Sequence, residues 1–386
     1  MNFDEVIERR GTHCAKWDMM EQVYRVDKSD GIAMWVADMD FRPPEVACDA
    51  IERMLGHGVF GYYGDERDYL SAICRWMQKR HGWKVKPEWV FSTHGLVNGT
   101  ALCIDAFTEP GEGIVLFTPV YHAFARIITA ANRRVIECPL DERDGKYRFA
   151  FDRYDALIDD KTKLVILCSP HNPGGRVWTR GELQELASFC RKHDLILISD
   201  EIHHDLVMPG HRHVPMPLAA PEIVDRLAML TAVTKTFNLA GAHTGNVIVE
   251  DERLRRRFRR RMDALGISPN SFGLFLAEAV YSAEGAEWVD RLMRYVEANS
   301  KRFDVVNEIP GVRSMPLEAT YLAWVSFRDT GLTDAEIQRR VLQEAKIAAN
   351  LGPTFGKGGE GFVRFNLATP KSLVNEAVKR LRRAFA

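Results

Sequence analysis

The chain has 386 residues, of which 46% are hydrophobic and 27% are charged, and its formal net charge is −1. This length suffices for one large hydrophobic core and a smaller second domain. A charge balance near zero excludes a protein that its overall charge steers to nucleic acid or to a membrane surface. No apolar run approaches the roughly 20 residues that a membrane-spanning helix needs.

The cysteines indicate a reducing environment. Seven of them are scattered along the chain without a C-x-x-C pair, at positions 14, 48, 74, 103, 138, 168 and 190. The first thirteen residues carry acidic side chains and lack an apolar core, so we expect no signal peptide. These features predict free thiols and a cytoplasmic location.

The N-terminal part combines an irregular segment with two predicted helices. Residues 1–44 show little periodicity, and the double proline at 43–44 suits the first turn of a helix. Apolar residues at helical spacing predict helices over residues 45–55 and 69–81. Between them, a glycine-punctuated loop carries Tyr62 and Tyr63, which either serve a function or pack locally.

From residue 90 onwards, apolar strands alternate with helices. Short apolar runs bounded by turn residues predict strands over residues 90–95, 113–118, 163–168, 195–199, 227–233 and 246–250. Helices are predicted over residues 96–107 and from the capping box formed by Thr179 and Glu182 to about residue 193. Continuous apolar strands with helices between them are typical of a parallel sheet covered on both faces, which predicts an α/β fold.

The C-terminal third has a different pattern. A helix predicted over residues 251–265 holds seven arginines around one apolar face, which favours a solvated or subunit-contacting surface, with nucleic-acid binding as the alternative. Further helices are predicted over residues 274–307, 333–346 and 371–385, and strands over residues 321–327 and 363–367. This mixture predicts a second, α+β domain that the N-terminal segment joins.

Four polar residues follow the ends of predicted strands, namely Tyr121, Asn172, Asp200 and Lys235. Ligands of parallel sheets bind at the carboxyl ends of the strands, so we expect these side chains to converge. A lysine in such a place either extends to solvent or stays buried. Burial lowers the pKa of a lysine amine and makes it a nucleophile for carbonyl carbons.

An aldehyde cofactor bound by Lys235 needs an electron sink and an anchor. Asp200 can pair with a protonated pyridine nitrogen, although a helix N-cap or a turn is the alternative role for this aspartate. Tyr121 can stack on an aromatic ring, and Asn172 can donate a hydrogen bond to a ring hydroxyl. Backbone N–H groups near Gly95 can bind a phosphate. These requirements describe pyridoxal 5'-phosphate.

Four segments resemble the class I/II aminotransferase superfamily of fold type I. They are SPHNPGGRVW (169–178), SDEIHHDL (199–206), TKTFNLAG (234–241) and RFNLATP (364–370). The intervals between Asn172, Asp200 and Lys235 agree with this superfamily as well. Three further segments resemble the MalY/PatB branch of cystathionine β-lyases, or C–S lyases, namely KWD (16–18), WVADMDF (35–41) and HGVFGYY (57–63).

The resemblance implies an overall organisation. The expected fold is α/β, of the pyridoxal-phosphate-dependent type I, with a mostly parallel seven-stranded sheet between helices. Residues 45–282 are expected to form the large cofactor-binding domain, and residues 1–44 and 283–386 the small domain. The resemblance also implies a homodimer with shared active sites, an amino-acid substrate, and neither nucleic acid nor membrane as a partner.

By position, the resemblance implies a role for each site residue. Lys235 is expected to be the Schiff-base lysine and proton shuttle, Asp200 the partner of the pyridine nitrogen, and Tyr121 the stacking residue. The implied cofactor-binding residues are Gly95, Leu96, Tyr121, Asn172, Asp200, His203 beside the ring hydroxyl, Thr234, Lys235, His243, and Tyr62 from a second subunit. The implied substrate-binding residues are Arg364, which grips the α-carboxylate, Asn172 and Tyr62.

Two positions depart from the pattern of many relatives near the phosphate. His243 stands where many relatives have an arginine, and Ala232 stands where many have a serine. Both replacements leave the implied phosphate site with fewer binding groups than in those relatives.

The resemblance implies a carbon–sulfur β-lyase that cleaves an S-substituted cysteine to a thiol, pyruvate and ammonia. An aminotransferase acting on an amino acid and a 2-oxo acid is the alternative, because the same residues serve both reactions. A metal site is a further alternative, built from His203, His204, His211 and His213 with Asp200 and Glu201, although we expect no metal. A regulatory role through partner contact is the remaining alternative.

Overall fold

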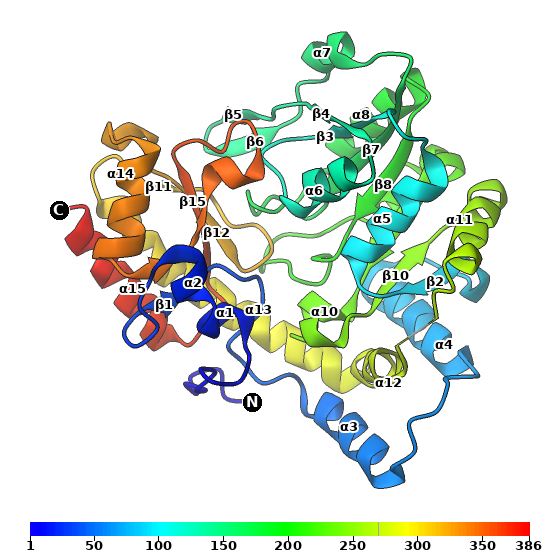
Figure 1. Ribbon diagram of the computed structural model, residues 1–386, viewed down its shortest axis with the longest axis horizontal. Helices are drawn as coiled ribbons and strands as arrows, with labels where there is room; N and C mark the ends of the chain where they lie inside the picture. The colour runs from blue at the N-terminus through cyan, green and yellow to red at the C-terminus, as the bar shows by residue number, and fades with distance from the viewer. Residues whose placement is uncertain (269) are drawn as a thin grey trace.

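A computed structural model describes residues 1–268 and 270–386 (Figure 1). Its centre is a seven-stranded sheet whose strands lie in the order β2, β10, β9, β8, β7, β3, β4. Strand β10 runs antiparallel to both of its neighbours, and the remaining neighbours pair in parallel. The strands are β2 (Val90–Thr93), β3 (Gly113–Leu116), β4 (Arg134–Glu137), β7 (Thr162–Cys168), β8 (Ile196–Asp200), β9 (Leu227–Thr231) and β10 (Gly245–Ile248).

Helices cover both faces of this sheet, as the apolar strands require. Along β7, Leu164 and Ile166 face one apolar cluster while Val165 and Leu167 face another. The first cluster includes α5 (Leu96–Phe107), α6 (Ala123–Ala130) and α11 (Glu252–Ala264), and the second includes α8 (Arg180–Lys192) and α9 (Met216–Ala219). The predicted capping box of α8 is present, since Thr179 and Glu182 bond each other's backbone N–H groups.

A third helical group extends below the sheet in Figure 1. It comprises α3 (Glu45–His57), α4 (Arg67–Trp76) and α12 (Ser271–Val280). Helices α3 and α4 each pack against α12 around a third apolar cluster, distinct from the two above. The loop between α3 and α4 carries the two adjacent tyrosines. No helix among the described residues combines the length and the apolar character of a membrane-spanning segment.

The C-terminal part forms a separate antiparallel sheet in the order β11, β12, β15, β14. Its strands are β11 (Arg313–Ser314), β12 (Leu322–Ser326), β14 (Asn350–Leu351) and β15 (Phe362–Asn366), packed with α13 (Ala283–Phe303), α14 (Asp334–Arg339) and α15 (Lys371–Ala384). In the N-terminal segment, which also holds α1 (Ala15–Asp18) and α2 (Met20–Tyr24), β1 (Ile32–Ala33) pairs in parallel with β13 (Ile347–Ala348). The two ends of the chain therefore share one core, while the division into domains stays a prediction.

The structure corrects several sequence-based expectations. Strand β4 completes the sheet but was not predicted, because Arg134–Glu137 is a partly exposed edge strand with only two apolar residues. The short hairpin β5 (Asp141–Arg143) and β6 (Lys146–Arg148) and the helix α7 (Phe151–Tyr154) were missed for the same lack of apolar periodicity. The helix predicted over residues 274–307 is two helices, α12 and α13.

Lys235 does not emerge directly from a strand. It lies in the four-residue helix α10 (Val233–Thr236), after β9 has ended at Thr231. The apolar run that predicted a longer strand continues into this helix, where Val233 is buried.

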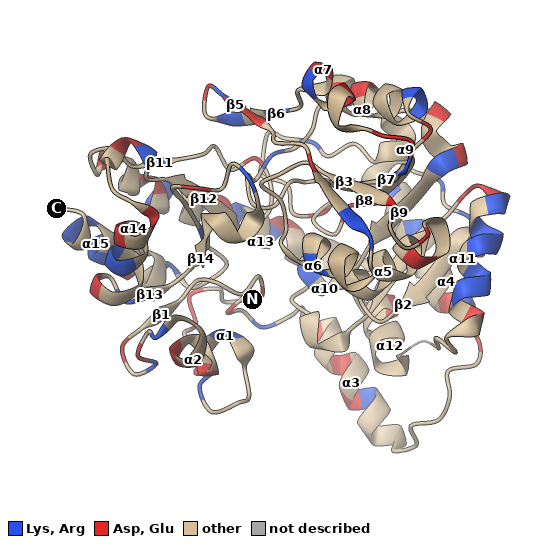
Figure 2. Cartoon of the chain, turned by 45° about the horizontal axis from the view of Figure 1, so that its top comes forward, with Lys and Arg blue, Asp and Glu red and all other residues tan. Residues whose placement is uncertain are grey.

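Internal contacts account for most of the arginines on α11, which form the blue band along this helix in Figure 2. Arg261 pairs with Asp105 at 2.6 Å, and Arg255 donates to the carbonyl of Glu250 at 2.6 Å. Arg257 donates to the carbonyl of Ala106 at 3.1 Å. These contacts fix α11 against α5 and against the segment that precedes it, and they agree with a solvated face.

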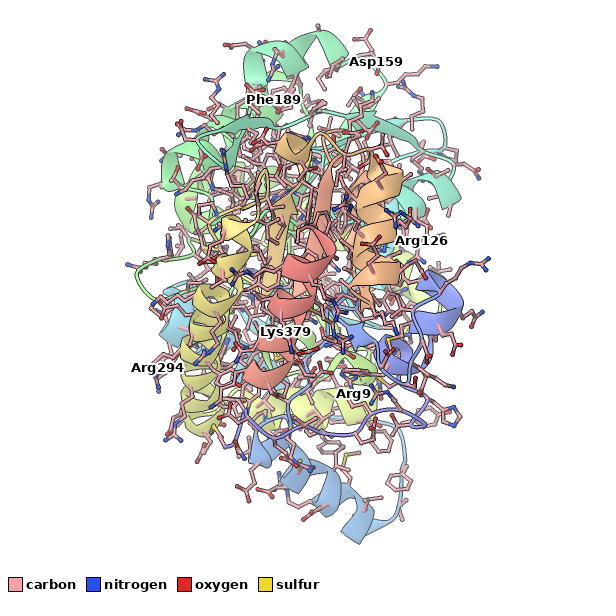
Figure 3. All side chains as sticks on the ribbon, turned by 90° about the vertical axis from the view of Figure 1, so that its left-hand side faces the viewer. Arg9, Arg126, Asp159, Phe189, Arg294 and Lys379 are labelled. Carbon is pink, nitrogen blue, oxygen red and sulfur yellow. The ribbon has the colours of Figure 1, made fainter. Side chains whose placement is uncertain are left out.

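A buried ionic cluster anchors the segment of residues 35–41. Lys16 is fully buried, and its ammonium lies 2.7 Å from Asp40, which is also buried. The indole N–H of Trp17 donates to Asp40 at 2.9 Å, and Arg9, labelled in Figure 3, pairs with Asp40 at 2.7 Å. Burial alone raises the pKa of Asp40, but Lys16 and the other donors outweigh it and lower the pKa. Residues 16–18 and 35–41, which the sequence singled out, thus hold each other in place.

We expect Asp40→Asn to lower the free energy of unfolding by about 3 kcal/mol, because it removes the nearer counter-charge of the buried Lys16 and leaves only Asp38, at 3.8 Å. Chemical denaturation measures this change. The matched control is Asp65→Asn, which removes an exposed ion pair with Arg67 and costs at most about 1 kcal/mol. Equal losses in the two variants would contradict the anchoring role of Asp40.

Candidate active site

A cavity of about 650 Å³ lies at the carboxyl ends of the strands, bordered by residues of the second sheet. It brings together almost all of the site residues that the sequence predicted. Those that line it are Gly95, Leu96, Tyr121, Asn172, Asp200, His203, Thr234, Lys235, His243 and Arg364. They come from seven separate parts of the chain, so the fold and not sequence proximity assembles them.

The amine of Lys235 is held at the floor of this cavity. It donates to the backbone carbonyl of Ala37 at 2.6 Å, and the hydroxyl of Tyr321 donates to the same oxygen at 2.9 Å. Burial lowers the pKa of Lys235 to about 8, with a smaller contribution from the positive charge of Arg364. The uncharged, nucleophilic form of this amine is therefore far more populated near neutral pH than in a free lysine.

Asp200 is a buried carboxylate without a side-chain donor among the described residues. It is the last residue of β8, and it accepts one hydrogen bond, from the backbone N–H of Ile202 at 3.1 Å. Burial raises its pKa to about 7, and the neighbouring Glu201 acts in the same direction. A buried carboxylate in this state favours a positively charged or protonated partner at the cavity.

Arg364 is the opposite case, a buried cation that faces the cavity. Its guanidinium donates to the side-chain oxygen of Asn172 at 2.9 Å, to that of Asn350 at 2.6 Å, and to the carbonyl of Trp35 at 2.8 Å. These acceptors are uncharged, and burial lowers the pKa of Arg364 to about 10. A carboxylate is the group that a guanidinium held in this way binds best.

His203 is buried beside these groups and stays neutral. Burial is the main reason that its pKa lies well below the ordinary value, and the charge of Lys235 adds to it. Its Nδ1 atom has no hydrogen-bond partner within the described chain. Asn172 uses its oxygen for Arg364, so its amide group can donate only to another molecule or residue.

The N-terminus of α5 forms one end of the cavity. Gly95 caps the helix with φ of 82°, a conformation that favours glycine, although a Cβ there would meet no atom within 4 Å. The first-turn N–H groups of a helix lack intrahelical partners and bind anions. Thr234 and His243 line the same cavity, whereas Ala232 is fully buried and does not.

Tyr121 and Tyr62 occupy different surroundings. The ring of Tyr121 borders the cavity and lies 5.1 Å from the ring of His122, and burial raises its pKa. Tyr62 is fully exposed in the loop between α3 and α4 and does not line this cavity. Its predicted contribution from a second subunit stays a prediction.

Known proteins resemble this chain over its whole length. The profile of the family described as aminotransferase class I and II matches residues 30–381. The chain belongs to this family. It is 38% identical to cystathionine beta-lyase PatB of Bacillus subtilis (strain 168) over 390 residues, which cover 100% of both chains.

A second relative and a solved structure agree with the family assignment. The chain is 31% identical to protein MalY of Escherichia coli (strain K12), an alignment that covers 98% of this chain and 97% of MalY. The crystal structure of cystalysin from Treponema denticola contains pyridoxal 5'-phosphate and matches with a TM-score of 0.94 and 34% identity. That match covers 99% of this chain and 98% of cystalysin, and it confirms the expected type I fold.

Several residues of this aminotransferase-family site were not predicted from the sequence. The backbone carbonyl of Ala37 accepts hydrogen bonds from both Lys235 and the hydroxyl of Tyr321, and Asn350 accepts one from Arg364. Only Ala37 had a signal in the sequence, because it lies within the segment of residues 35–41 that resembles the MalY/PatB branch. Nothing in the local sequence marked Asn350, or Tyr24, whose hydroxyl accepts a hydrogen bond from Asn350 at 2.9 Å.

The histidines of the alternative metal site do not gather in the expected combination. His213 pairs with Glu201 at 2.6 Å, while His211 lies on the surface. Among the described residues, the one group with metal-ligand proximity is His81, His204 and Asp205. Two of these three residues were not part of the predicted set.

We expect the reactivity of Lys235 in cofactor-free protein to follow a pKa of about 8. Reductive labelling with a small aldehyde should speed up through pH 8 and then level off, because the neutral amine is the reacting form. A free lysine, with a pKa of about 10.4, continues to gain reactivity up to higher pH. Peptide mass spectrometry measures the label at residue 235, and Lys235→Arg serves as the blank. A rate that still climbs steeply above about pH 9 would contradict the effect of burial.

Proposed function

We propose that this protein is a pyridoxal-phosphate-dependent carbon–sulfur β-lyase that cleaves an S-substituted cysteine to a thiol, pyruvate and ammonia. The observation that carries the proposal is the meeting of a half-buried amine, a buried carboxylate and a buried guanidinium, from Lys235, Asp200 and Arg364, in one cavity. The choice of lyase is supported by the full-length similarity to cystathionine beta-lyase PatB.

The side chains around the cavity fit the proposed cofactor. The anion-binding end of α5 suits the phosphate, and Asp200 suits a protonated ring nitrogen. The free amide of Asn172 and the unpartnered Nδ1 of His203 suit the ring hydroxyl. Lys235 would hold the aldehyde carbon. When bound, pyridoxal phosphate supplies an electron-withdrawing ring and a carbonyl group that condenses with amines.

The roles of the protein's own residues follow from their positions. Arg364 binds the substrate α-carboxylate and thereby fixes the bond between the α-carbon and its hydrogen relative to Lys235. The neutral Lys235 amine removes the α-proton at Nζ, and the resulting ammonium can return a proton to the departing sulfur. Asp200 keeps a proton on the ring nitrogen, and the buried walls exclude water from these transfers.

An aminotransferase remains the alternative, because the family whose profile matches residues 30–381 is described as aminotransferase class I and II. The two reactions differ in what happens after the α-proton is removed. A β-lyase expels the sulfur group, whereas an aminotransferase returns the proton to the cofactor and needs a 2-oxo acid to complete its cycle.

We also propose a homodimer in which the loop between α3 and α4 reaches the cavity of the second subunit. This loop exposes Val59, Phe60 and Tyr62 beside a hollow of about 760 Å³ that α3 and α12 also line. Exposed apolar patches of this kind mark interaction surfaces. A cytoplasmic location is proposed with it, supported by seven cysteines that are all unpaired. Sedimentation of the purified protein tests the dimer.

We expect the purified protein to bind pyridoxal phosphate with a visible absorbance band and to release pyruvate from cystathionine without any added 2-oxo acid. Lys235→Ala should lose both the band and the activity, since it removes the amine that holds the cofactor. Lactate dehydrogenase coupling measures the pyruvate. A strict requirement for a 2-oxo acid would replace the lyase with the aminotransferase, and an unchanged band in Lys235→Ala would contradict the assignment of the lysine.

A further inference from the structure

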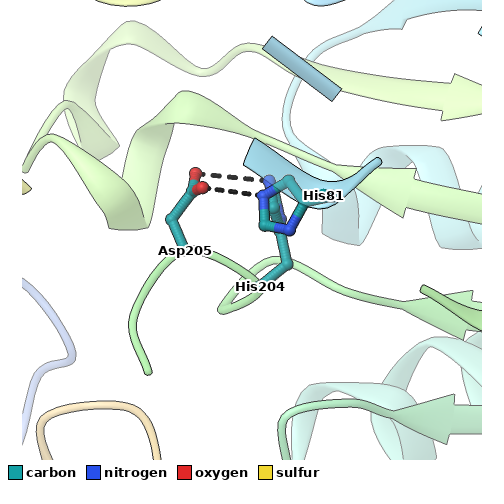
Figure 4. A group of neighbouring side chains, drawn as sticks. All are labelled: His81, His204 and Asp205. Carbon is teal, nitrogen blue, oxygen red and sulfur yellow. Dashed lines mark hydrogen bonds and ion pairs between the residues drawn. The ribbon is translucent and has the colours of Figure 1, made fainter. Parts of the chain in front are cut away.

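Behind the cavity lies a buried cluster of polar side chains around Asp205, which we call the Asp205 cluster. It contains Asp205, Trp76, His81, His204 and Thr236, and none of these residues lines the cavity. The side chain of Asp205 is fully buried, and Figure 4 shows its carboxylate facing both histidine rings.

The carboxylate of Asp205 forms hydrogen bonds with side chains from three elements. His81, at the end of the helical segment that continues α4, lies 2.8 Å from Oδ1. The indole N–H of Trp76 lies 3.1 Å from each oxygen, and the hydroxyl of Thr236 donates to Oδ2 at 3.1 Å. Burial by itself raises the pKa of Asp205, but His204, His81 and Arg80 outweigh it and hold the pKa below its ordinary value. Asp205 is therefore a buried anion at neutral pH.

The same contacts favour a hydrogen-bonded anion over a metal ligand. His81, His204 and Asp205 offer atoms within 4.8 Å of one another, as a metal site requires. Both oxygens of Asp205 already accept hydrogen bonds from Trp76, and Arg80 places a positive charge 3.4 Å from Oδ1. A cation between these groups would face that charge.

The position of the cluster connects it to the proposed active site. Thr236 directly follows Lys235 in α10, so its bond to Asp205 fixes the far side of the helix that presents the amine. Asp205 itself ends the turn of residues 202–205, which contains His203 and closely follows Asp200 at the end of β8. One buried carboxylate thus joins the helix of the lysine to the turn of the ring-facing residues.

We propose that Asp205 is a positioning residue, which holds α10 in fixed relation to the end of β8 and the turn of residues 202–205, so that Lys235, Asp200 and His203 meet one cofactor ring. This inference rests on the proposed function. It concerns placement only, since Asp205 contacts neither the cavity nor a ligand in it.

The test compares Thr236→Val, Thr236→Ser and Asp205→Asn. Thr236→Val removes the hydrogen bond at nearly constant volume, and we expect kcat to fall about 10- to 100-fold with little change in KM, because small displacements of a reacting group cost this much. The dissociation constant of pyridoxal phosphate, measured by absorbance, should rise in the same variant. Thr236→Ser keeps the hydroxyl and should restore both values, and Asp205→Asn should resemble Thr236→Val.

Several outcomes would overturn the proposal. Unchanged kcat and cofactor affinity in both Thr236→Val and Asp205→Asn would remove the positioning role. A lowered melting temperature with unchanged cofactor affinity and kcat would leave a role in stability alone. Stoichiometric metal in the wild type that Asp205→Asn loses would replace positioning with a metal site. Cofactor affinity is measured without turnover, so it reports on Asp205 even if the lyase activity itself is absent.

A second observation concerns the charge of the cavity lining. Asp200 is the one acidic side chain among the described residues that line it, whereas Lys235, Arg364 and Arg126 are basic. The proposed function uses the first two cations and leaves Arg126 without a role. This arginine lies in the first turn of α6, is exposed, and is labelled in Figure 3.

Arg126 lies on the same wall as the carboxylate-binding Arg364 but nearer to solvent. The guanidinium of Arg364 lies 5.0 Å from the ring of Phe355, which in turn lies 5.9 Å from the ring of His122. His122 is exposed, and partial desolvation together with the charges of Arg364 and Arg126 lowers its pKa. His122, Arg364 and Arg126 all line the cavity, with Arg364 buried and Arg126 exposed.

We infer that Arg126 binds a negatively charged group at the far end of the substrate, so that the preferred substrates are S-substituted cysteines with a carboxylate beyond the sulfur. This inference deepens the proposed function and rests on it. With Arg364 fixing the α-carboxylate, a substrate that extends along this wall brings its second carboxylate toward the mouth.

The test compares S-(2-carboxyethyl)cysteine with S-propylcysteine, which has a methyl group in place of the carboxylate. Arg126→Gln should lower kcat/KM about tenfold for the acidic substrate and leave the neutral one unchanged, as expected for one charge-assisted contact. Arg126→Lys should recover part of the loss. Arg260→Gln, which changes an arginine on α11 that does not line the cavity, should alter neither value.

Equal effects on both substrates, or none on either, would overturn the role of Arg126. The change of the visible cofactor band on substrate binding gives dissociation constants without turnover. Selective weakening of the acidic ligand in that measurement would keep the subsite even if no pyruvate forms and the lyase proposal fails.

Discussion

Burial of charge without a matching counter-charge is the constraint on which this structure depends. Asp200 and Arg364 are both almost fully buried in one cavity, yet they do not pair with each other, and neither has a counter-ion among the described residues. Isolated buried charges are costly, and a fold retains them where a ligand completes them. The raised pKa of Asp200 and the lowered pKa of Lys235 are two expressions of this same desolvation.

Much of the remaining structure serves to hold these groups still. The side chain of Asn238 bonds the backbone of Met39 and Phe41, which ties the end of α10 to the segment of residues 35–41. Asp40 anchors that segment from the opposite side through Lys16. The amine of Lys235 is thereby fixed between two elements that lie about 200 positions apart in the chain.

The sequence predicted the sheet and most of the cavity because these features have local signals. Apolar runs marked six of seven strands, and the glycine before α5 marked the anion-binding end. The sequence could not predict β4, a partly exposed edge strand, or α10, whose four residues are too few for a helical period. Contacts between distant residues, such as His81 with Asp205, leave no periodic pattern. A single chain also cannot test the role of Tyr62, which requires a second copy.

The acceptor of the Lys235 amine is a main-chain carbonyl, that of Ala37. Exchanging the side chain at position 37 leaves this oxygen in place, so a scan of point substitutions would record the position as tolerant. The geometry of the Lys235 amine would instead respond to changes at residues that hold the backbone from outside the cavity. A substitution scan of this protein would therefore identify the residues that position the backbone around the cavity, and it would miss the main-chain atom that contacts the amine.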